Sequence, residues 1–237
     1  MNRQSILIAD DEPKILKAVA SFFESRGFNA VTAENGRRAL EIFDAEGPEL
    51  VVLDLMLPDI SGERVCRELR RRSRVPIIML TAKAAEEDLI AGLSLGSDDY
   101  VTKPFSLKEL YARAQAVLRR VESERAPRSE RAASSARRSF RNGELTIDFE
   151  ENAVRKNGVL LNLTPSEAGI LYALAKRPGK TFTRDELITL ALGGEFDGFD
   201  RAIDNHIKNL RRKIEDDTRR PVYILTAHGL GYRFGGE

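Results

Sequence analysis

The sequence predicts an α/β doubly wound domain with a five-stranded parallel sheet, followed by a smaller α+β domain. In the first half of the chain, short continuous apolar runs alternate with amphipathic helical patterns, as in a sheet that helices cover on both faces. Beyond a polar segment, the pattern changes to alternating strands, three helices and a terminal pair of strands. The length of 237 residues also favours two domains over one.

Five apolar runs are the predicted strands of the first domain. They lie at residues 6–9, 30–33, 50–53, 77–80 and 100–102. The predicted helices of this domain lie at residues 15–26, 37–45, 62–72, 86–95 and 107–121. Because parallel neighbours need crossover connections, we expect these helices to cover both faces of one sheet.

The polar segment at residues 122–139 is the predicted linker between domains 1–121 and 140–237. It is rich in Arg, Ser and Ala and has no large apolar residue, so it buries too little surface to offset the entropy of ordering. Alternatively, the preceding helix continues through residues 122–126 and stops at Pro127.

The second domain begins with alternating apolar and polar residues that predict antiparallel strands. The predicted strands lie at residues 145–149, 153–155, 159–161, 223–226 and 231–234, with three helices between the third and the fourth. The last two strands enclose a glycine-rich turn, which predicts a terminal hairpin.

The composition excludes several classes of protein. The single cysteine, Cys66, excludes a disulfide framework within the chain and a zinc site with several cysteines. No apolar run approaches the length of a membrane span, and the N-terminus does not resemble a signal peptide. We therefore expect a cytoplasmic protein with no membrane segment. Lys and Arg number 38 and Asp and Glu number 37, so the net charge alone does not indicate nucleic-acid binding.

Charged and polar residues follow the predicted strands of the first domain. Asp10, Asp11 and Glu12 close the first strand. Asp54 closes the third, Thr81 closes the fourth, and Lys103 follows the fifth. Functional groups of doubly wound sheets gather at this edge, and grouped carboxylates favour Mg²⁺. A hydroxyl and an ammonium group beside them suit phosphoryl transfer to a carboxylate. Each residue alone could be a helix cap, a turn residue or a surface charge, but their joint position favours the functional interpretation.

Residues 1–121 resemble the receiver domain of two-component response regulators, which has a flavodoxin-like fold. The matching motifs lie at residues 9–12, 51–58, 78–82 and 98–105. The resemblance implies that Asp54 is the phosphoacceptor, with Thr81 and Lys103 as catalytic partners, and that a sensor histidine kinase is the donor. It also implies Mg²⁺ ligands and a switch pair. The ligands would be Asp10, Asp11, Asp54 and the carbonyl of Met56, and the pair would be Thr81 and Tyr100. The bond between Lys103 and Pro104 resembles the cis peptide of the family.

An enzyme is the alternative from another class. Phosphatases of the haloacid-dehalogenase type carry a second aspartate two residues after the phosphorylated one, as a general acid. Met56 stands at that position, so an aspartyl-phosphate hydrolase would lack its proton donor. We therefore expect a switch and not an enzyme.

The helix predicted at residues 201–215 has an apolar and a polar face. Its apolar residues recur at helical spacing and are Ile203, Ile207, Leu210 and Ile214. The polar face carries Arg201, Asn205, Lys208, Asn209 and Arg212. Basic and amide side chains on one face suit contacts with phosphates and base edges in a major groove of DNA. By composition alone, an ordinary amphipathic surface helix is an equal alternative.

Residues 140–237 resemble the winged helix-turn-helix domain of the OmpR/PhoB type. The matching motifs lie at residues 163–167, 183–187, 204–213 and 229–234, and Thr164 with Glu167 also forms a predicted capping box. The resemblance implies contacts with double-stranded DNA from Arg201, Asn205, His206, Lys208, Asn209, Arg212, Thr226 and His228. Three positions depart from the common pattern. Leu192 replaces a frequent Trp, and Asn209 and His228 replace frequent arginines, so we expect a base preference that differs from that of well-known members.

Active receivers of this family pair through their fourth helix, fifth strand and fifth helix. The resemblance therefore implies a homodimer interface with Leu89, Asp98, Asp99, Glu109, Arg113 and Arg120. The expected pairs between subunits are Asp99 with Arg113 and Asp98 with Arg120. Leu89 replaces a basic residue that would face Glu109, so one ionic contact is missing. Alternatively these are solvated surface charges, since exposed pairs contribute only about 0–1 kcal/mol each.

These observations predict a transcriptional regulator controlled by phosphorylation. Phosphorylation of Asp54 would promote receiver dimerisation and operator binding, with RNA polymerase as a candidate further partner. Leu89 motivates the alternative of a regulator that dimerises and binds DNA without phosphorylation.

Overall fold

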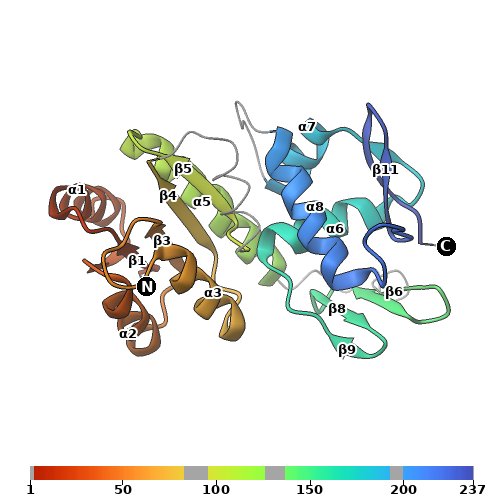
Figure 1. Ribbon diagram of the computed structural model, residues 1–237, viewed down its shortest axis with the longest axis horizontal. Coiled ribbons are helices and arrows are strands. Elements are labelled where there is room, and N and C mark those ends of the chain that lie inside the picture. Colours follow the sequence, from red (N-terminus) through yellow and green to blue (C-terminus); the bar gives the residue numbers. More distant parts are fainter. Residues whose placement is uncertain (1–2, 83–95, 126–136, 193–199, 237) are drawn as a thin grey trace. The chain divides into compact units, whose positions relative to one another are not determined.

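The computed structural model describes residues 3–82, 96–125, 137–192 and 200–236 (Figure 1). The chain divides into two compact units, Met1–Leu118 and Arg119–Glu237. Within the described residues, no helix is both long and apolar enough to cross a membrane.

The first unit contains the predicted five-stranded parallel sheet, with strand order β2-β1-β3-β4-β5. The strands are β1 (Ser5–Ala9), β2 (Asn29–Ala33), β3 (Leu50–Asp54), β4 (Ile77–Thr81) and β5 (Asp99–Thr102). The described helices are α1 (Pro13–Glu24), α2 (Gly36–Glu46), α3 (Gly62–Arg72) and α5 (Leu107–Arg125). These elements confirm the doubly wound prediction, while the helix predicted at residues 86–95 lies outside the described part of the chain.

Helices cover both faces of this sheet. On one face, Ile6, Val52 and Leu80 pack with apolar residues of α1 and α5 in a single core cluster. Alternate strand residues such as Leu7 and Val51 point to the other face and are also fully buried. The continuous apolar runs of the sequence are therefore strands buried on both sides.

The segment expected as a linker is shorter than residues 122–139. The helix α5 continues to Arg125, in agreement with the alternative of helical continuation, and β6 (Arg137–Phe140) already begins at Arg137. Only residues 126–136 separate the two elements, and they lie outside the described residues.

The described residues of the second unit form two antiparallel sheets and three α-helices. The sheets have strand orders β6-β7-β8-β9 and β10-β12-β11. The further strands are β7 (Leu145–Asp148), β8 (Ala153–Lys156), β9 (Val159–Leu160), β10 (Thr181–Phe182), β11 (Ile224–Ala227) and β12 (Gly231–Phe234). The helices are α6 (Pro165–Lys176), α7 (Arg184–Leu187) and α8 (Asp200–Ile214), and a π-helical turn η1 (Ile188–Leu192) follows α7. Strands β6 and β10 were not predicted.

The sequence signals of this unit are present in its structure. Thr164 and Glu167 form the predicted capping box at the start of α6, and Thr183 and Glu186 form a second one at α7. The apolar stripe of α8 is buried in the core, because Ile203, Ile207, Leu210 and Ile214 are each at most 1% exposed.

Candidate functional site

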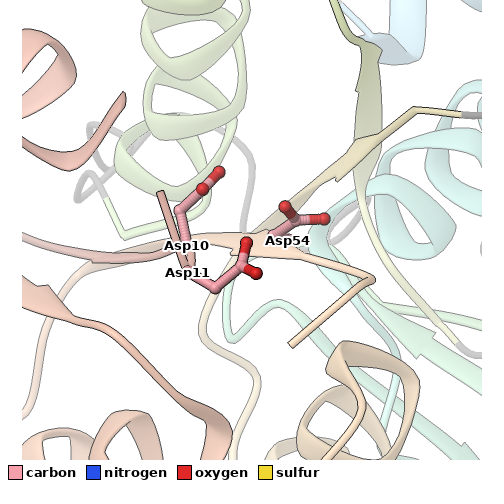
Figure 2. Close-up of side chains that lie close together, drawn as sticks. All are labelled: Asp10, Asp11 and Asp54. Carbon is pink, nitrogen blue, oxygen red and sulfur yellow. The ribbon is translucent and has the colours of Figure 1, made fainter. Parts of the chain in front are cut away.

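Three carboxylates meet at the carboxyl edge of the parallel sheet. Asp10 and Asp11 directly follow β1, and Asp54 is the last residue of the neighbouring strand β3 (Figure 2). One carboxylate oxygen from each residue lies within 4.8 Å of the others. Asp10 and Asp54 are buried and Asp11 is exposed, so the cluster opens to solvent on one side.

Lys103 lies beside these carboxylates because it follows β5 at the same edge. Its Nζ is 2.7 Å from Oδ2 of Asp10, 2.5 Å from Oδ2 of Asp54 and 3.5 Å from Oε1 of Glu12. Burial alone would lower the pKa of Lys103, but the bonds to Asp10 and Asp54 outweigh burial and raise it. Lys103 is therefore a fixed positive charge. Glu12 was expected at this edge together with Asp10 and Asp11, but it was given no role in catalysis or metal binding.

The backbone after β3 holds Asp54 in place. The N–H of Met56 donates to Oδ1 of Asp54 at 3.0 Å. Gly62, the first residue of α3, lies against the same segment, so closely that a Cβ there would overlap the carbonyl oxygen of Asp54. The N–H of Gly62 also donates to the carbonyl of Leu55 at 3.0 Å. The turn that carries Asp54 is thus packed directly on the start of a helix, a contact that the sequence motif did not reveal.

Thr81 and Tyr100 lie on neighbouring strands at this side of the sheet. Thr81 ends β4, Tyr100 belongs to β5, and both side chains are buried. Burial, followed by the neighbouring charge of Asp99, raises the pKa of the Tyr100 hydroxyl, which stays protonated at neutral pH. The bond between Lys103 and Pro104 is cis, as expected.

The donor set fits Mg²⁺. Its ligand atoms are carboxylate oxygens, the type that hard divalent cations prefer. Burial, opposed by the hydrogen bond from Lys103 and reinforced by the charge of Asp54, raises the pKa of Asp10. A carboxylate with this shift gains from added positive charge, and a single lysine does not balance three carboxylates.

The predicted DNA-contacting residues fall into an exposed group and a buried group. Lys208 and Arg212 are exposed, as are Thr226 and His228 in and after β11. Asn205, His206 and Asn209 are buried, at 7%, 1% and 5% exposure. The expectation that one exposed face carries both basic and amide groups is therefore not met. His206 lies three residues after Ile203 and four before Leu210, which places it beside the apolar stripe. The side chain of Arg201 lies outside the described residues.

Comparisons with known proteins agree for both units. Residues 6–115 match the family described as response regulator receiver domain, and residues 158–234 match transcriptional regulatory protein, C terminal. The sensory transduction protein RegX3 of Mycobacterium tuberculosis is 41% identical over 232 residues, which cover 98% of this chain and 99% of that protein. The alkaline phosphatase synthesis transcriptional regulatory protein PhoP of Bacillus subtilis is 42% identical over 234 residues, which cover 98% of this chain and 97% of that protein. The chain belongs to the OmpR/PhoB family of response regulators.

Solved structures agree with this assignment. DrrB, an OmpR/PhoB homologue from Thermotoga maritima, is 34% identical with a TM-score of 0.52, and the match covers 99% of this chain and 100% of that one. A mutant of RitR has a TM-score of 0.76 and is 22% identical, and the match covers 99% of this chain and 100% of that one. At this identity the likeness supports the fold alone. The response regulator is thus a DNA-binding transcriptional regulator of a two-component system, and its receiver implies a histidine kinase partner.

The acidic residues expected at a dimer interface have partners within the response regulator itself. Asp98 forms an ion pair with Arg70, and Nη1 of Arg113 lies 3.3 Å from Oδ1 of Asp99. Arg113 also contacts Glu109, one helical turn away, with Nη2 at 3.2 Å from Oε1. Pairing between subunits would require Asp98 and Asp99 to exchange these partners within the chain for arginines of a second receiver. Leu89 and the side chain of Arg120 lie outside the described residues.

Two basic residues of α8 form hydrogen bonds with other residues of the DNA-binding unit. Arg211 donates to the carbonyl of Ile224, and Lys213 donates to Glu167 and to the carbonyl of Asn162. Neither residue belongs to the polar face predicted from the sequence. Arg211 lies four residues after Ile207, which places it beside the apolar stripe.

Proposed function

We propose that Asp54 of this response regulator accepts a phosphoryl group from the partner kinase, and that phosphorylation promotes pairing of receivers and operator binding. The observation that carries the proposal is the contact of one lysine with two carboxylates at the sheet edge. Lys103 Nζ lies 2.7 Å from Asp10 and 2.5 Å from Asp54. This arrangement supplies a nucleophile, a fixed positive charge and a set of oxygen ligands in one place.

In the proposed reaction, a carboxylate oxygen of Asp54 attacks the phosphorus atom. The new P–O bond forms as the bond between phosphorus and the kinase histidine nitrogen breaks, and the imidazole leaves. The Met56 N–H orients the carboxylate through its 3.0 Å bond to Oδ1. Lys103 pairs with an oxygen of the transferred group, and the hydroxyl of Thr81 donates to another.

Asp10, Asp11, Asp54 and the carbonyl of Met56 are the proposed Mg²⁺ ligands. When bound, the ion neutralises the negative charge that accumulates between the carboxylates and the incoming phosphoryl group. Lys103 alone leaves the three carboxylates with an excess of negative charge, which supports a requirement for the ion.

The effect of phosphorylation is proposed to pass from Asp54 to the rest of the receiver through Thr81 and Tyr100. Movement of Thr81 toward the phosphoryl group would change the packing of Tyr100, whose neighbour Asp99 is paired with Arg113 of α5. Release of this pair would allow Asp99 to bind Arg113 of a second receiver. The homodimer would then place two DNA-binding units on adjacent half-sites in the cytoplasm, with RNA polymerase as a candidate further partner.

The test is phosphorylation of the full chain by acetyl phosphate in the presence of Mg²⁺. We expect one phosphoryl group by intact-mass measurement, and we expect Asp54→Asn to abolish it because an amide is not a competent nucleophile. Asp59→Asn, a change in the loop after β3, is the matched control and should leave labelling intact. Undiminished labelling of Asp54→Asn would place the phosphoacceptor elsewhere.

A further inference from the structure

The first strand of the terminal hairpin is bound by an arginine of α8. Arg211 donates from Nε and Nη2 to the carbonyl oxygen of Ile224, at 3.0 and 2.7 Å. Nη2 also donates to Oγ1 of Thr226 at 2.9 Å, and the guanidinium lies 5.7 Å from the ring centre of Tyr232 on β12. One side chain thus connects α8 to both strands of the hairpin.

The residue directly after α8 holds the start of the same strand. Glu215 follows Ile214, the last residue of α8, and its N–H still donates to the carbonyl of Arg211 at 2.9 Å, so the two side chains lie on the same side of the helix axis. Its carboxylate accepts the N–H groups of Val222, Tyr223 and Ile224 at 2.8, 2.9 and 2.9 Å. Glu215 is buried, and its three charge-assisted bonds fix the chain where it enters β11.

We propose that Arg211 and Glu215 are positioning residues that set the place of the β11–β12 hairpin relative to α8. The inference rests on the proposed operator binding, with the DNA contacts that the family resemblance implies: α8 in a major groove and further contacts from Thr226 and His228. A helix and a hairpin that contact one duplex together must keep a fixed separation, because a binding constellation tolerates displacements of only about 0.5 Å. Arg211 therefore contributes to sequence discrimination through the hairpin and not as a phosphate contact.

A substitution of Glu215 distinguishes a positioning role from direct contact with DNA. A buried carboxylate cannot bind a DNA phosphate, and removing its negative charge would favour association electrostatically. A loss of sequence discrimination in Glu215→Gln must therefore come from displacement of β11. Arg211 offers a complementary comparison, because Lys keeps the positive charge but lacks the fork that donates to Ile224 and Thr226 together.

The experiment measures binding of the full chain to two duplexes across a salt series. One duplex is selected by the unmodified chain from a random pool, and the other is its scrambled form. We expect Arg211→Gln, Arg211→Lys and Glu215→Gln to weaken the selected duplex about tenfold, with little effect on the scrambled one and an unchanged salt slope. The matched control is Arg212→Gln on the exposed side of α8. It should weaken both duplexes and lower the slope by about one.

The outcomes that overturn the proposal are distinct. Full restoration by Arg211→Lys, or an equal loss on both duplexes in Arg211→Gln with a lower salt slope, would make Arg211 a phosphate contact. Unchanged binding of Glu215→Gln would remove the positioning role of that residue. Circular dichroism shows whether each variant is folded. If Arg211→Gln is unfolded, the binding of Arg211→Lys and Glu215→Gln decides between the two roles. If the unmodified chain selects no duplex from the pool, the proposed DNA reading itself fails.

Discussion

Arg70 and Asp98 form an ion pair inside the receiver, with Nη2 of Arg70 2.7 Å from Oδ2 of an Asp98 side chain that is fully buried. Arg70 also donates to the carbonyls of Gly96 and Val75, and the N–H of Ile77 donates to the same Asp98 oxygen at 2.9 Å. The pair therefore joins α3 to the segments that enter β4 and β5. Asp98 would have to leave these partners before it could bind an arginine of another subunit.

Arg70→Met should destabilise the receiver by about 3–5 kcal/mol, because it leaves a buried carboxylate without its positive partner. Arg71→Met is the matched control: its ion pair with Glu68 is exposed, and its loss should change stability by less than about 1 kcal/mol. Hydrogen exchange of peptides from β4 and β5 across a urea series measures the effect within the full chain. Equal protection in both variants would show that the pair adds little to the stability of the receiver.

Asp11→Ala should weaken Mg²⁺ binding and slow phosphorylation by acetyl phosphate together. The change removes the exposed member of the three carboxylates and leaves Asp10 and Asp54 in place. Calorimetric titration with Mg²⁺ and the rate of mass increase are the two measurements. Asp44→Ala, on α2, is the control and should alter neither. An unchanged Mg²⁺ affinity in Asp11→Ala would move the ion to other ligands.

Arg113→Ala should reduce dimerisation of the phosphorylated protein while labelling of Asp54 stays intact. In the structure Arg113 lies 3.3 Å from Asp99 and 3.2 Å from Glu109 of its own chain, so these contacts must open before Arg113 can bind Asp99 of a second receiver. Sedimentation velocity of phosphorylated samples gives the dimer fraction. Arg38→Ala, which breaks an exposed pair on α2, is the control. Equal sedimentation of Arg113→Ala and the parent would favour an interface around Leu89.

Lys208 and Asn209 should contribute to DNA binding in different ways. Lys208→Gln should weaken binding to every duplex and lower the salt slope by about one, because an exposed lysine suits a phosphate. Asn209→Ala should cost about 1–3 kcal/mol on the selected duplex and little on random DNA, as expected of an amide that reads a base edge. Binding of both variants to selected and scrambled duplexes across a salt series is the measurement.

The burial of Asn209 sharpens this comparison. Its amide is only 5% exposed, so base reading requires a conformation in which it is uncovered. Equal losses on both duplexes would show that Asn209 does not read a base. If Asn209→Ala changes the affinity for neither duplex, this side of α8 does not face the groove.

Features that depend on neighbouring strand ends were predictable from sequence. Asp10 and Asp54 could be placed at one edge of the sheet because parallel strands end there and apolar runs mark each end. Their close contact depends in addition on the strand order that makes β1 and β3 neighbours. The capping box at Thr164 was equally local, since both of its members lie within four residues.

Features that depend on distant partners were not predictable. The side chains of Arg70 and Asp98 are 28 positions apart and resemble surface charges in the sequence, so their burial was not visible. Strand β6 was missed because residues 137–139 are two arginines and a serine, and pairing with β7 supplies the strand conformation. The contact of Arg211 with β11 was also not visible, because helical spacing does not show which strand lies within reach of its side chain.

The close approach of Gly62 to the Asp54 carbonyl makes this glycine part of the pocket, although it contributes no functional group. A side chain at residue 62 would meet backbone atoms that cannot rotate away, and it would push the turn that carries Asp54 off the start of α3. Transplanting the pocket to another α/β scaffold therefore requires more than the three aspartates and the lysine. The recipient must also let a helix begin against the strand end without a Cβ, and a scaffold that lacks such a start would carry the same side chains in a different geometry.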